Sequence, residues 1–182
     1  MCMERNRVVL VDVNDTELGT ADKMQAHEKG LLHRAFSIFV VRETNGVKEV
    51  LLQQRALTKY HCAGLWSNTC CSHPQQGENI TQSAINRLTE ELGFTVNNLI
   101  WVDSHCYKAK LSNNLIEHEF DHLFVKHLSK QASNKLQIRP NPAEVNAIDW
   151  LSIEQIELDL KNTANKYTPW FKDTFYKVLS KL

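Results

Sequence analysis

The chain has 182 residues, with 21 Lys and Arg against 21 Asp and Glu, and this length suits one domain spanning residues 1–182. The balanced charge gives no indication of binding to nucleic acid or to an anionic membrane. No apolar run reaches membrane-spanning length, and the N-terminal residues lack the apolar core of a signal peptide. We therefore expect a soluble, cytoplasmic monomer. Its five cysteines are an odd number, which in a reducing compartment favours free thiols, metal ligands or a catalytic thiol over disulfides.

The first third of the chain predicts β-structure. Val8–Val13 is a candidate strand, and Ala35–Val41 and Glu49–Gln54 are apolar and partly β-branched. Asn45-Gly46 lies between the last two segments and is a strong turn signal, so we expect a hairpin there. Between the first strand and the hairpin we expect a loop, which contains Lys23, His27 and His33.

A segment rich in Cys, His, Trp and Gly follows, from Arg55 to Gly77. It has no clear period and predicts loop with short strands. Residues 80–92 predict a helix, because apolar residues recur there every four positions. Gly93 stands where a helix end is expected. The apolar stripe consists of Ile80, Ala84, Leu88 and Leu92, widened by Ile85.

The remaining elements complete a mixed pattern. Ile100–Ala109 and Leu115–Lys126 predict long strands, joined by Ser112-Asn113-Asn114, and Ala147–Leu151 predicts a short one. Two helices are expected at the end, over Ile153–Leu160 and Pro169–Leu182, the latter with Trp170, Phe171, Phe175 and Val178 on one stripe. Strands interleaved with a few helices favour an α/β (α+β) fold with a mixed β-sheet.

Three acids alternate along the predicted strand 115–126. Since alternate residues share a face, Glu117, Glu119 and Asp121 project together, while His118 and its alternate neighbours point the other way. Two carboxylates on one face make half of a metal site. The same pattern also fits a solvent-facing row of acids on an edge strand, and on spacing alone that explanation is the more frequent one.

The motif Cys70-Cys71-Ser72-His73 has no second pair of cysteines with zinc-ribbon spacing. Adjacent residues of a strand face opposite ways, so at most one of Cys70 and Cys71 faces a given site. Buried inert thiols are the alternative. A non-catalytic zinc module built on Cys62, Cys70, Cys71 and His73 is a third hypothesis.

Histidines supply the other ligands of a candidate metal site. His27, His33 and His73 are each compatible with a surface position, but together with Glu117 and Glu119 they make a mixed nitrogen and oxygen site. Such a donor set suits Mn²⁺, Fe²⁺ or Zn²⁺ better than Mg²⁺.

Charged side chains around the predicted helix suit a diphosphate. Glu91 lies one turn after Arg87, where it forms either a surface ion pair or a carboxylate that holds Mg²⁺ beside a phosphate. Lys23, Arg55 and Lys59 offer bidentate donors and point charges, although dispersed cations also occur on ordinary solvated surfaces.

The end of this helix resembles the Nudix box, G-x5-E-x7-R-E-U-x-E-E-x-G-U. The pattern is met at Glu78, Leu88, Glu90, Glu91, Gly93 and Phe94, and is missed where Ser72, Asn86 and Arg87 replace Gly, Arg and Glu. The resemblance implies a Nudix-like mixed β-sheet sandwiched by helices. It also keeps a Nudix-type diphosphate hydrolase as an alternative, which the missing acid at position 87 puts in doubt.

Most of the chain resembles the type 1 isopentenyl-diphosphate isomerases. The resemblance rests on ordered segments: His27 to Ser37, Gln54 to Lys59, Gly64 to Pro74, Glu90 to Gly93, Tyr107-Lys108-Ala109, Glu117-His118-Glu119, Glu144-Val145 and Thr168-Pro169-Trp170. The family's activity, conversion of isopentenyl diphosphate to dimethylallyl diphosphate in isoprenoid biosynthesis, is what this resemblance implies.

The resemblance also implies residue roles. Cys71 and Glu119 match the two catalytic residues. His27, His33, His73, Glu117 and Glu119 match the ligands of a site for Mn²⁺ or Zn²⁺. Glu91 and the backbone carbonyl of Cys71 match the ligands of a Mg²⁺ that also binds the diphosphate. Lys23, Arg55, Lys59 and Arg87 match diphosphate contacts, and Ser72 stands beside them. Tyr107 is expected to hydrogen-bond Glu119, and Trp170, with Trp66 as a further candidate, is expected to cover a carbocation with its π face. Trp170 is equally suited to anchor the last helix in the core.

Overall fold

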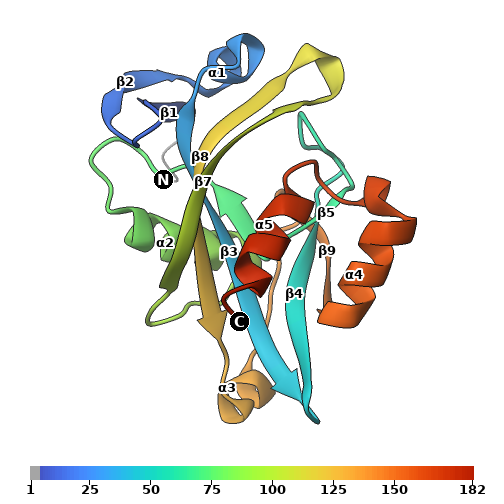
Figure 1. Cartoon of the computed structure of the whole chain (residues 1–182). Coiled ribbons are helices and arrows are strands. Elements are labelled where there is room, and N and C mark those ends of the chain that lie inside the picture. The colour runs from blue at the N-terminus through green and yellow to red at the C-terminus, as the bar shows by residue number, and fades with distance from the viewer. Residues whose placement is uncertain (1–4) are drawn as a thin grey trace.

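Nine strands of the described chain form one mixed sheet that runs through the molecule (Figure 1). The computed structural model describes residues 5–182, so Met1–Glu4, which belong to the N-terminal segment considered above, lie outside the described residues. The strands are β1 (Arg7–Val11), β2 (Glu17–Asp22), β3 (His33–Thr44), β4 (Val47–Arg55), β5 (Trp66–Ser67), β6 (Cys70–Ser72), β7 (Ile100–Lys110), β8 (Ile116–His127) and β9 (Val145–Ser152). The helices are α1 (Lys23–Lys29), α2 (Ile80–Leu92), α3 (Lys130–Lys135), α4 (Ile153–Asn162) and α5 (Phe171–Leu179), with short 3₁₀ turns at Ser112–Asn114 and Ala164–Lys166.

Strand β3 is the centre of the sheet. It pairs antiparallel with β4 across the Asn45-Gly46 turn, as predicted, and parallel with β8. Both turn residues have positive φ, 53° and 81°, which is the backbone that a tight hairpin requires. The parallel register sets His33 opposite Glu119. A histidine and a carboxylate that are far apart in the sequence therefore lie side by side on neighbouring strands.

The sheet is covered by helices on both faces (Figure 1). Phe36, Ile38 and Val40 of β3 pack into a core with α2, whereas Phe39 and Val41 pack into a second core with α4 and α5. This alternation is the period of two that a strand buried on both faces shows. The expected fold class, a mixed sheet between helices, is confirmed, and so is the buried stripe of α5. The short helix α3 was not predicted.

Helix α2 has the predicted bounds. The Asn79 side chain accepts a hydrogen bond from the backbone N–H of Gln82, and Gly93 ends the helix in the left-handed region with φ 71°. A Cβ on Gly93 would lie 2.5 Å from the carbonyl oxygen of Arg139, whereas a Cβ on Gly77, with φ 77°, would meet nothing within 4 Å. Gly93 therefore carries both a conformational and a packing requirement.

These two glycines make a matched pair of substitutions. We expect Gly77→Ala to lower the free energy of unfolding by about 1 kcal/mol, the cost of placing a Cβ in the left-handed region. Gly93→Ala adds the clash and is expected to cost about 3 kcal/mol or more. Urea denaturation of both variants measures the difference. Equal losses of unfolding free energy in the two variants would show that the backbone at Arg139 moves away from the added Cβ at no energetic cost.

The predicted loop around Lys23 and His27 is wrong. This region folds into β2 and α1, because the Asp22 side chain caps the helix at Gln25 and Gly30 ends it in the left-handed region. Burial of Ala26 docks the helix in a small core with Val8. Lys23 and His27 are therefore held on a helix, and His33 is held at the start of β3.

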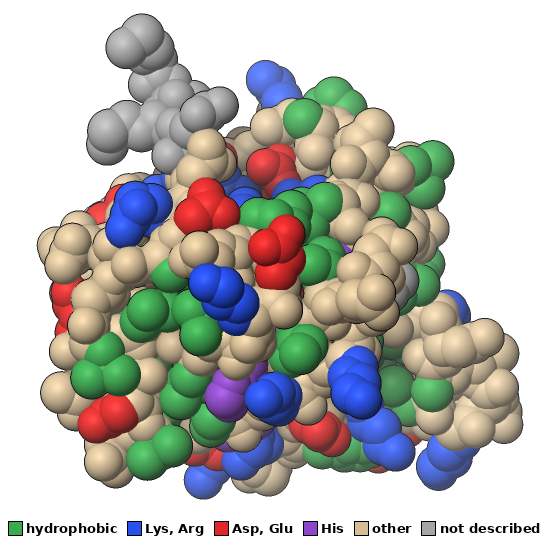
Figure 2. Space-filling model, turned by 90° about the horizontal axis from the view of Figure 1, so that it is seen from above, with side chains coloured by type: hydrophobic (Ala, Val, Ile, Leu, Met, Phe, Trp, Pro, Cys, Tyr) green, Lys and Arg blue, Asp and Glu red, His purple; other side chains and the backbone are tan. Residues whose placement is uncertain are grey.

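Hairpin β7–β8 follows the predicted boundaries closely. The alternative of a solvent-facing row of acids is wrong, because Glu117, Glu119 and Asp121 are only 3%, 7% and 1% exposed. On one outer face of the molecule, by contrast, basic, acidic and apolar side chains intermingle (Figure 2), in keeping with a formal net charge of zero.

Candidate active site

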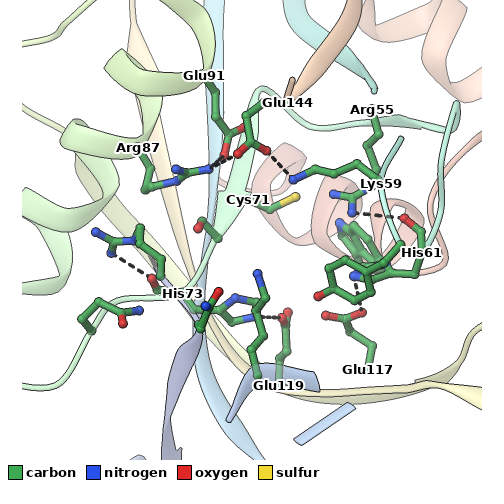
Figure 3. A pocket seen from close by; sticks show the side chains of 17 residues that line it. Arg55, Lys59, His61, Cys71, His73, Arg87, Glu91, Glu117, Glu119 and Glu144 are labelled. Carbon is green, nitrogen blue, oxygen red and sulfur yellow. Dashed lines mark hydrogen bonds and ion pairs between the residues drawn. The ribbon is translucent and has the colours of Figure 1, made fainter. Parts of the chain in front are cut away.

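A pocket of about 330 Å³ lies between α1, the segment after β4, α2 and β8. Figure 3 shows Cys71 between a group of charged residues around α2 and a group of histidines and glutamates beside β8. Of the predicted site residues, the pocket is lined by Lys23, Arg55, Lys59, Cys71, Ser72, His73, Arg87, Glu91, Glu117, Glu119 and Trp170. His27 and His33 do not line the pocket and are fully buried.

Four of the predicted metal ligands converge. One ligand atom each from His27, His33, His73 and Glu117 lies within 4.8 Å of the others. Glu119 adjoins them, because its Oε1 is 2.7 Å from His73 Nε2 and 3.7 Å from His33 Nε2. The predicted set of three imidazoles and two carboxylates is therefore one cluster, drawn from α1, β3, β8 and the residue after β6.

Backbone hydrogen bonds orient two of the imidazoles. His27 Nδ1 lies 2.7 Å from the carbonyl oxygen of Lys23, and His33 Nδ1 lies 2.8 Å from that of Leu31. A carbonyl only accepts, so each Nδ1 carries a proton and each Nε2 is directed at the cluster. His33 Nε2 and His73 Nε2 stand 3.2 Å apart, and burial lowers the pKa of both histidines to about 3. Two imidazole nitrogens that face each other at this distance are placed to share a cation.

The Glu119 carboxyl is shared between this cluster and Tyr107. The two residues are cross-strand partners in β7 and β8, and Tyr107 Oη donates a 2.5 Å hydrogen bond to Glu119 Oε2. This contact was predicted from the sequence and is confirmed. Burial raises the pKa of the Glu119 carboxyl, so that it takes up a proton more readily than an exposed glutamate.

Cys70 and Cys71 face opposite ways, as predicted for neighbours in a strand. Cys70 is fully buried in the core with α2, while Cys71 opens into the pocket. Burial raises the pKa of the Cys71 thiol to about 12, so the thiol keeps its proton. Ser67 Oγ lies 3.7 Å from its sulfur.

Oppositely charged residues alternate at the α2 side of the pocket. Arg87 pairs with Glu90 and with Glu91, each at 2.6 Å, and reaches Glu144 at 3.4 Å. Lys59 forms an ion pair with the same Glu144. Arg87, which replaces a glutamate of the Nudix box, thus places a cation between the Nudix-box acids Glu90 and Glu91.

Arg55, Lys23 and Trp170 border the pocket near the histidines. Arg55 is buried and its guanidinium lies 5.6 Å from the Trp170 ring, while Lys23 Nζ lies 5.4 Å from the Tyr60 ring. Trp170 lines the pocket and donates through Nε1 to Ser67 Oγ at 3.2 Å. Trp170 also directly precedes α5. It is therefore placed both to cover a ligand in the pocket and to anchor the last helix in the core. Trp66 instead packs against the core beside α5, so it is not placed to cover a ligand in this pocket.

Several residues of the pocket were given no role from the sequence. Tyr60, His61 and Glu144 line it, together with Arg5. Glu144 could have been identified as a candidate, because it lies in a segment that resembles the isomerase family. Its ion pair with Lys59 could not be predicted, because the two residues are 85 positions apart in the sequence. His61 lies in the segment from Arg55 to Gly77, for which the sequence predicted only loop and short strands.

The alternative of a zinc module built on cysteines fails on geometry. Cys70 belongs to the core, and neither Cys62 nor Cys71 belongs to the group of close ligand atoms found among the described residues. His73 instead joins the other histidines.

The sequence is similar to a known protein family and to several of its members. Residues 31–171 match the NUDIX domain family. "Isopentenyl-diphosphate Delta-isomerase" of Photobacterium profundum is 46% identical over 177 residues, which are 97% of this chain and 96% of that protein. A protein of the same name from Aliivibrio fischeri is 42% identical over 181 residues, 96% of each chain.

Solved structures share the fold at low identity. DR0079 from Deinococcus radiodurans superposes with a TM-score of 0.65 at 15% identity, over 86% of this chain and 90% of that one. The MutT protein from Methanosarcina mazei Go1 gives 0.60 at 17%, over 82% and 94%. In the part of the chain that the structure describes, no helix is long and apolar enough to cross a membrane. With this fold, and with such identity over nearly its full length, the chain belongs to the isopentenyl-diphosphate Delta-isomerase family of NUDIX-domain proteins.

Proposed function

We propose that this chain converts isopentenyl diphosphate to dimethylallyl diphosphate by a 1,3-allylic proton shift through a tertiary carbocation. The observation that carries the proposal is the presence in one pocket of a thiol, Cys71, and of a carboxyl that contacts the histidine cluster, Glu119. Family membership supports the reaction. We further propose that the protein works in the cytoplasm as a monomer, on a small molecule and not on nucleic acid or a membrane.

The residues present fit a divalent metal. The Nε2 atoms of His33 and His73 face each other, and the donor set of imidazoles and carboxylates suits Mn²⁺ or Zn²⁺. His27, His33, His73, Glu117 and Glu119 would hold it, and when bound it would supply positive charge that fixes the Glu119 carboxylate and sets its acidity. On the other side of the pocket, Glu91 and the Cys71 carbonyl would hold Mg²⁺ together with the diphosphate.

Proton transfer is assigned to two groups of the chain. An unactivated alkene is a very weak base, so an acid must add a proton to its terminal carbon and a base must remove one from C2 of the tertiary cation. Cys71 and Glu119 are proposed as this pair, one on each side of the flat five-carbon unit. Tyr107, which donates to Glu119 Oε2, keeps that carboxyl in place and relays its proton.

The remaining pocket residues are proposed to bind and shield the substrate. Arg55, Lys59, Lys23 and Arg87 would contact the diphosphate, with Ser72 beside them, because guanidinium and ammonium groups suit phosphate oxygens. The π face of Trp170 would lie against the cation and keep water from trapping it. The Arg87 guanidinium, paired with Glu90 and Glu91, replaces an acid of the Nudix box, which favours isomerisation over hydrolysis.

One assay separates the two activities. Proton NMR of isopentenyl diphosphate incubated with the protein, Mg²⁺ and Mn²⁺ is expected to show the dimethylallyl spectrum without phosphate release. A Nudix-type diphosphate hydrolase would release phosphate from a broad set of diphosphates instead. An unchanged alkene spectrum would sink the proposal.

Metal removal gives a further prediction. We expect EDTA to abolish isomerisation and leave the circular dichroism spectrum almost unchanged, because the two large cores do not depend on the cluster. Activity should return when Mg²⁺ and Mn²⁺ are restored. Unfolding on chelation would mean that the metal is structural.

A further inference from the structure

His61 lies beside the metal cluster, in the segment after β4, and has no part in the chemistry described so far. Its side chain is buried, and its Nε2 is 3.8 Å from Glu117 Oε2. Glu117 Oε1 faces the cluster, where it is 3.2 Å from His27 Nε2. Glu117 Oε2 and His61 Nδ1 are buried atoms without a hydrogen-bond partner among the described residues.

The His61 ring is held from several sides. It stacks on His27 with centroids 5.5 Å apart and meets Tyr60 and Trp170 edge to face at 4.4 and 6.1 Å. The His61 carbonyl accepts a hydrogen bond from Arg55 at 3.2 Å. The ring therefore has a fixed position between the cluster and the tryptophan.

We propose that His61 is a positioning residue for the metal site, and that its Nε2–H closes the 3.8 Å separation from Glu117 Oε2 and donates to it, so that Oε1 is presented to the three imidazoles. The inference rests on the metal site of the proposed function. A carboxylate that ligates through one oxygen keeps its orientation when the other oxygen is hydrogen-bonded. A buried carboxylate oxygen left without a donor would lose this orientation and carry a desolvation cost.

The geometry separates His61 from the group of candidate ligands. The group of converging ligand atoms includes His27, His33, His73 and Glu117 but not His61, and Glu117 Oε2 lies on the side of the carboxylate toward His61.

Two substitutions separate donation from packing. His61→Phe keeps a ring against His27 and Trp170 but has no donor, whereas His61→Gln keeps an N–H near the Nε2 position. We expect His61→Phe to weaken Mn²⁺ binding by about 10- to 100-fold and His61→Gln to weaken it by only a few-fold. His127→Phe, an exposed histidine of β8 outside the pocket, is the matched control and should bind Mn²⁺ like the unchanged protein.

Mn²⁺ affinity is measured by electron paramagnetic resonance of the free ion, and thermal unfolding in EDTA checks that each variant folds. Unchanged affinity in His61→Phe would overturn the inference. So would equal losses in His61→Phe and His61→Gln, since the ring itself, and not its proton, would then be required.

A measurement on the unchanged protein does not depend on any variant folding. In a long-range ¹H–¹⁵N spectrum of the protein loaded with Zn²⁺, His61 Nε2 is expected to appear as a protonated nitrogen. A metal-bound or unprotonated Nε2 would overturn the inference. These readouts do not use turnover, so a protein that binds Mn²⁺ as described and leaves the alkene unchanged would refute the proposed function alone.

Discussion

Replacing Cys71 by alanine is expected to lower kcat for isomerisation by about 100-fold or more, because a positioned acid or base contributes roughly 10²–10⁴ to such a rate. The thiol opens into the pocket and keeps its proton, and no other thiol of the described chain lines the pocket. Substrate binding should change little, since the proposed diphosphate contacts come from other side chains. Proton NMR of the alkene under saturating substrate measures the effect.

Cys70→Ala is the matched control for this prediction. Cys70 lies in the core behind the same strand, so its truncation should leave kcat within a few-fold and lower the free energy of unfolding by about 1 kcal/mol. Similar losses of turnover at both positions, with both variants folded, would contradict the assignment and indicate that the strand matters rather than the thiol.

The parts of this fold that the sequence predicts correctly are those whose sequence patterns lie within one short segment. Helix α2 was predicted to the residue because its apolar stripe and the terminal Gly93 all lie within a short segment. The hairpin at Asn45-Gly46 was predicted for the same reason. Helix α1 was missed because it has only 7 residues and is docked through the small core with Val8, so that tertiary packing, not periodicity, selects it.

The site itself depends on contacts that no local pattern contains. Alternation along β8 correctly put Glu117 and Glu119 on one face, but it left open whether that face meets solvent or the interior. The answer comes from the parallel pairing that sets His33 opposite Glu119. Resemblance to a family supplied the ligand set, and it supplied no role for His61, whose significance comes from its position beside Glu117.

Glu119→Gln is expected to reduce kcat by about 10²–10⁴ even when metal and substrate are saturating, because the amide cannot exchange a proton as the carboxyl does. Glu119 contacts His73 and Tyr107 through different oxygens, so the amide keeps the shape of the side chain. Glu43→Gln, at an exposed position of β3, is the chemical control and should leave turnover unchanged. Turnover in Glu119→Gln that returned with excess Mn²⁺ would reduce Glu119 to a metal ligand.

Tyr107→Phe tests the same carboxyl from its other side. It removes the 2.5 Å hydrogen bond to Glu119 Oε2, and a hydrogen bond to a charged group contributes about 1.5–3 kcal/mol, so kcat should fall by roughly 10- to 100-fold. If Tyr107 acts through Glu119, the double variant with Glu119→Gln should be no slower than Glu119→Gln alone. Additive losses would show that the phenol acts on the substrate independently, and a proton relay through Glu119 would then be excluded.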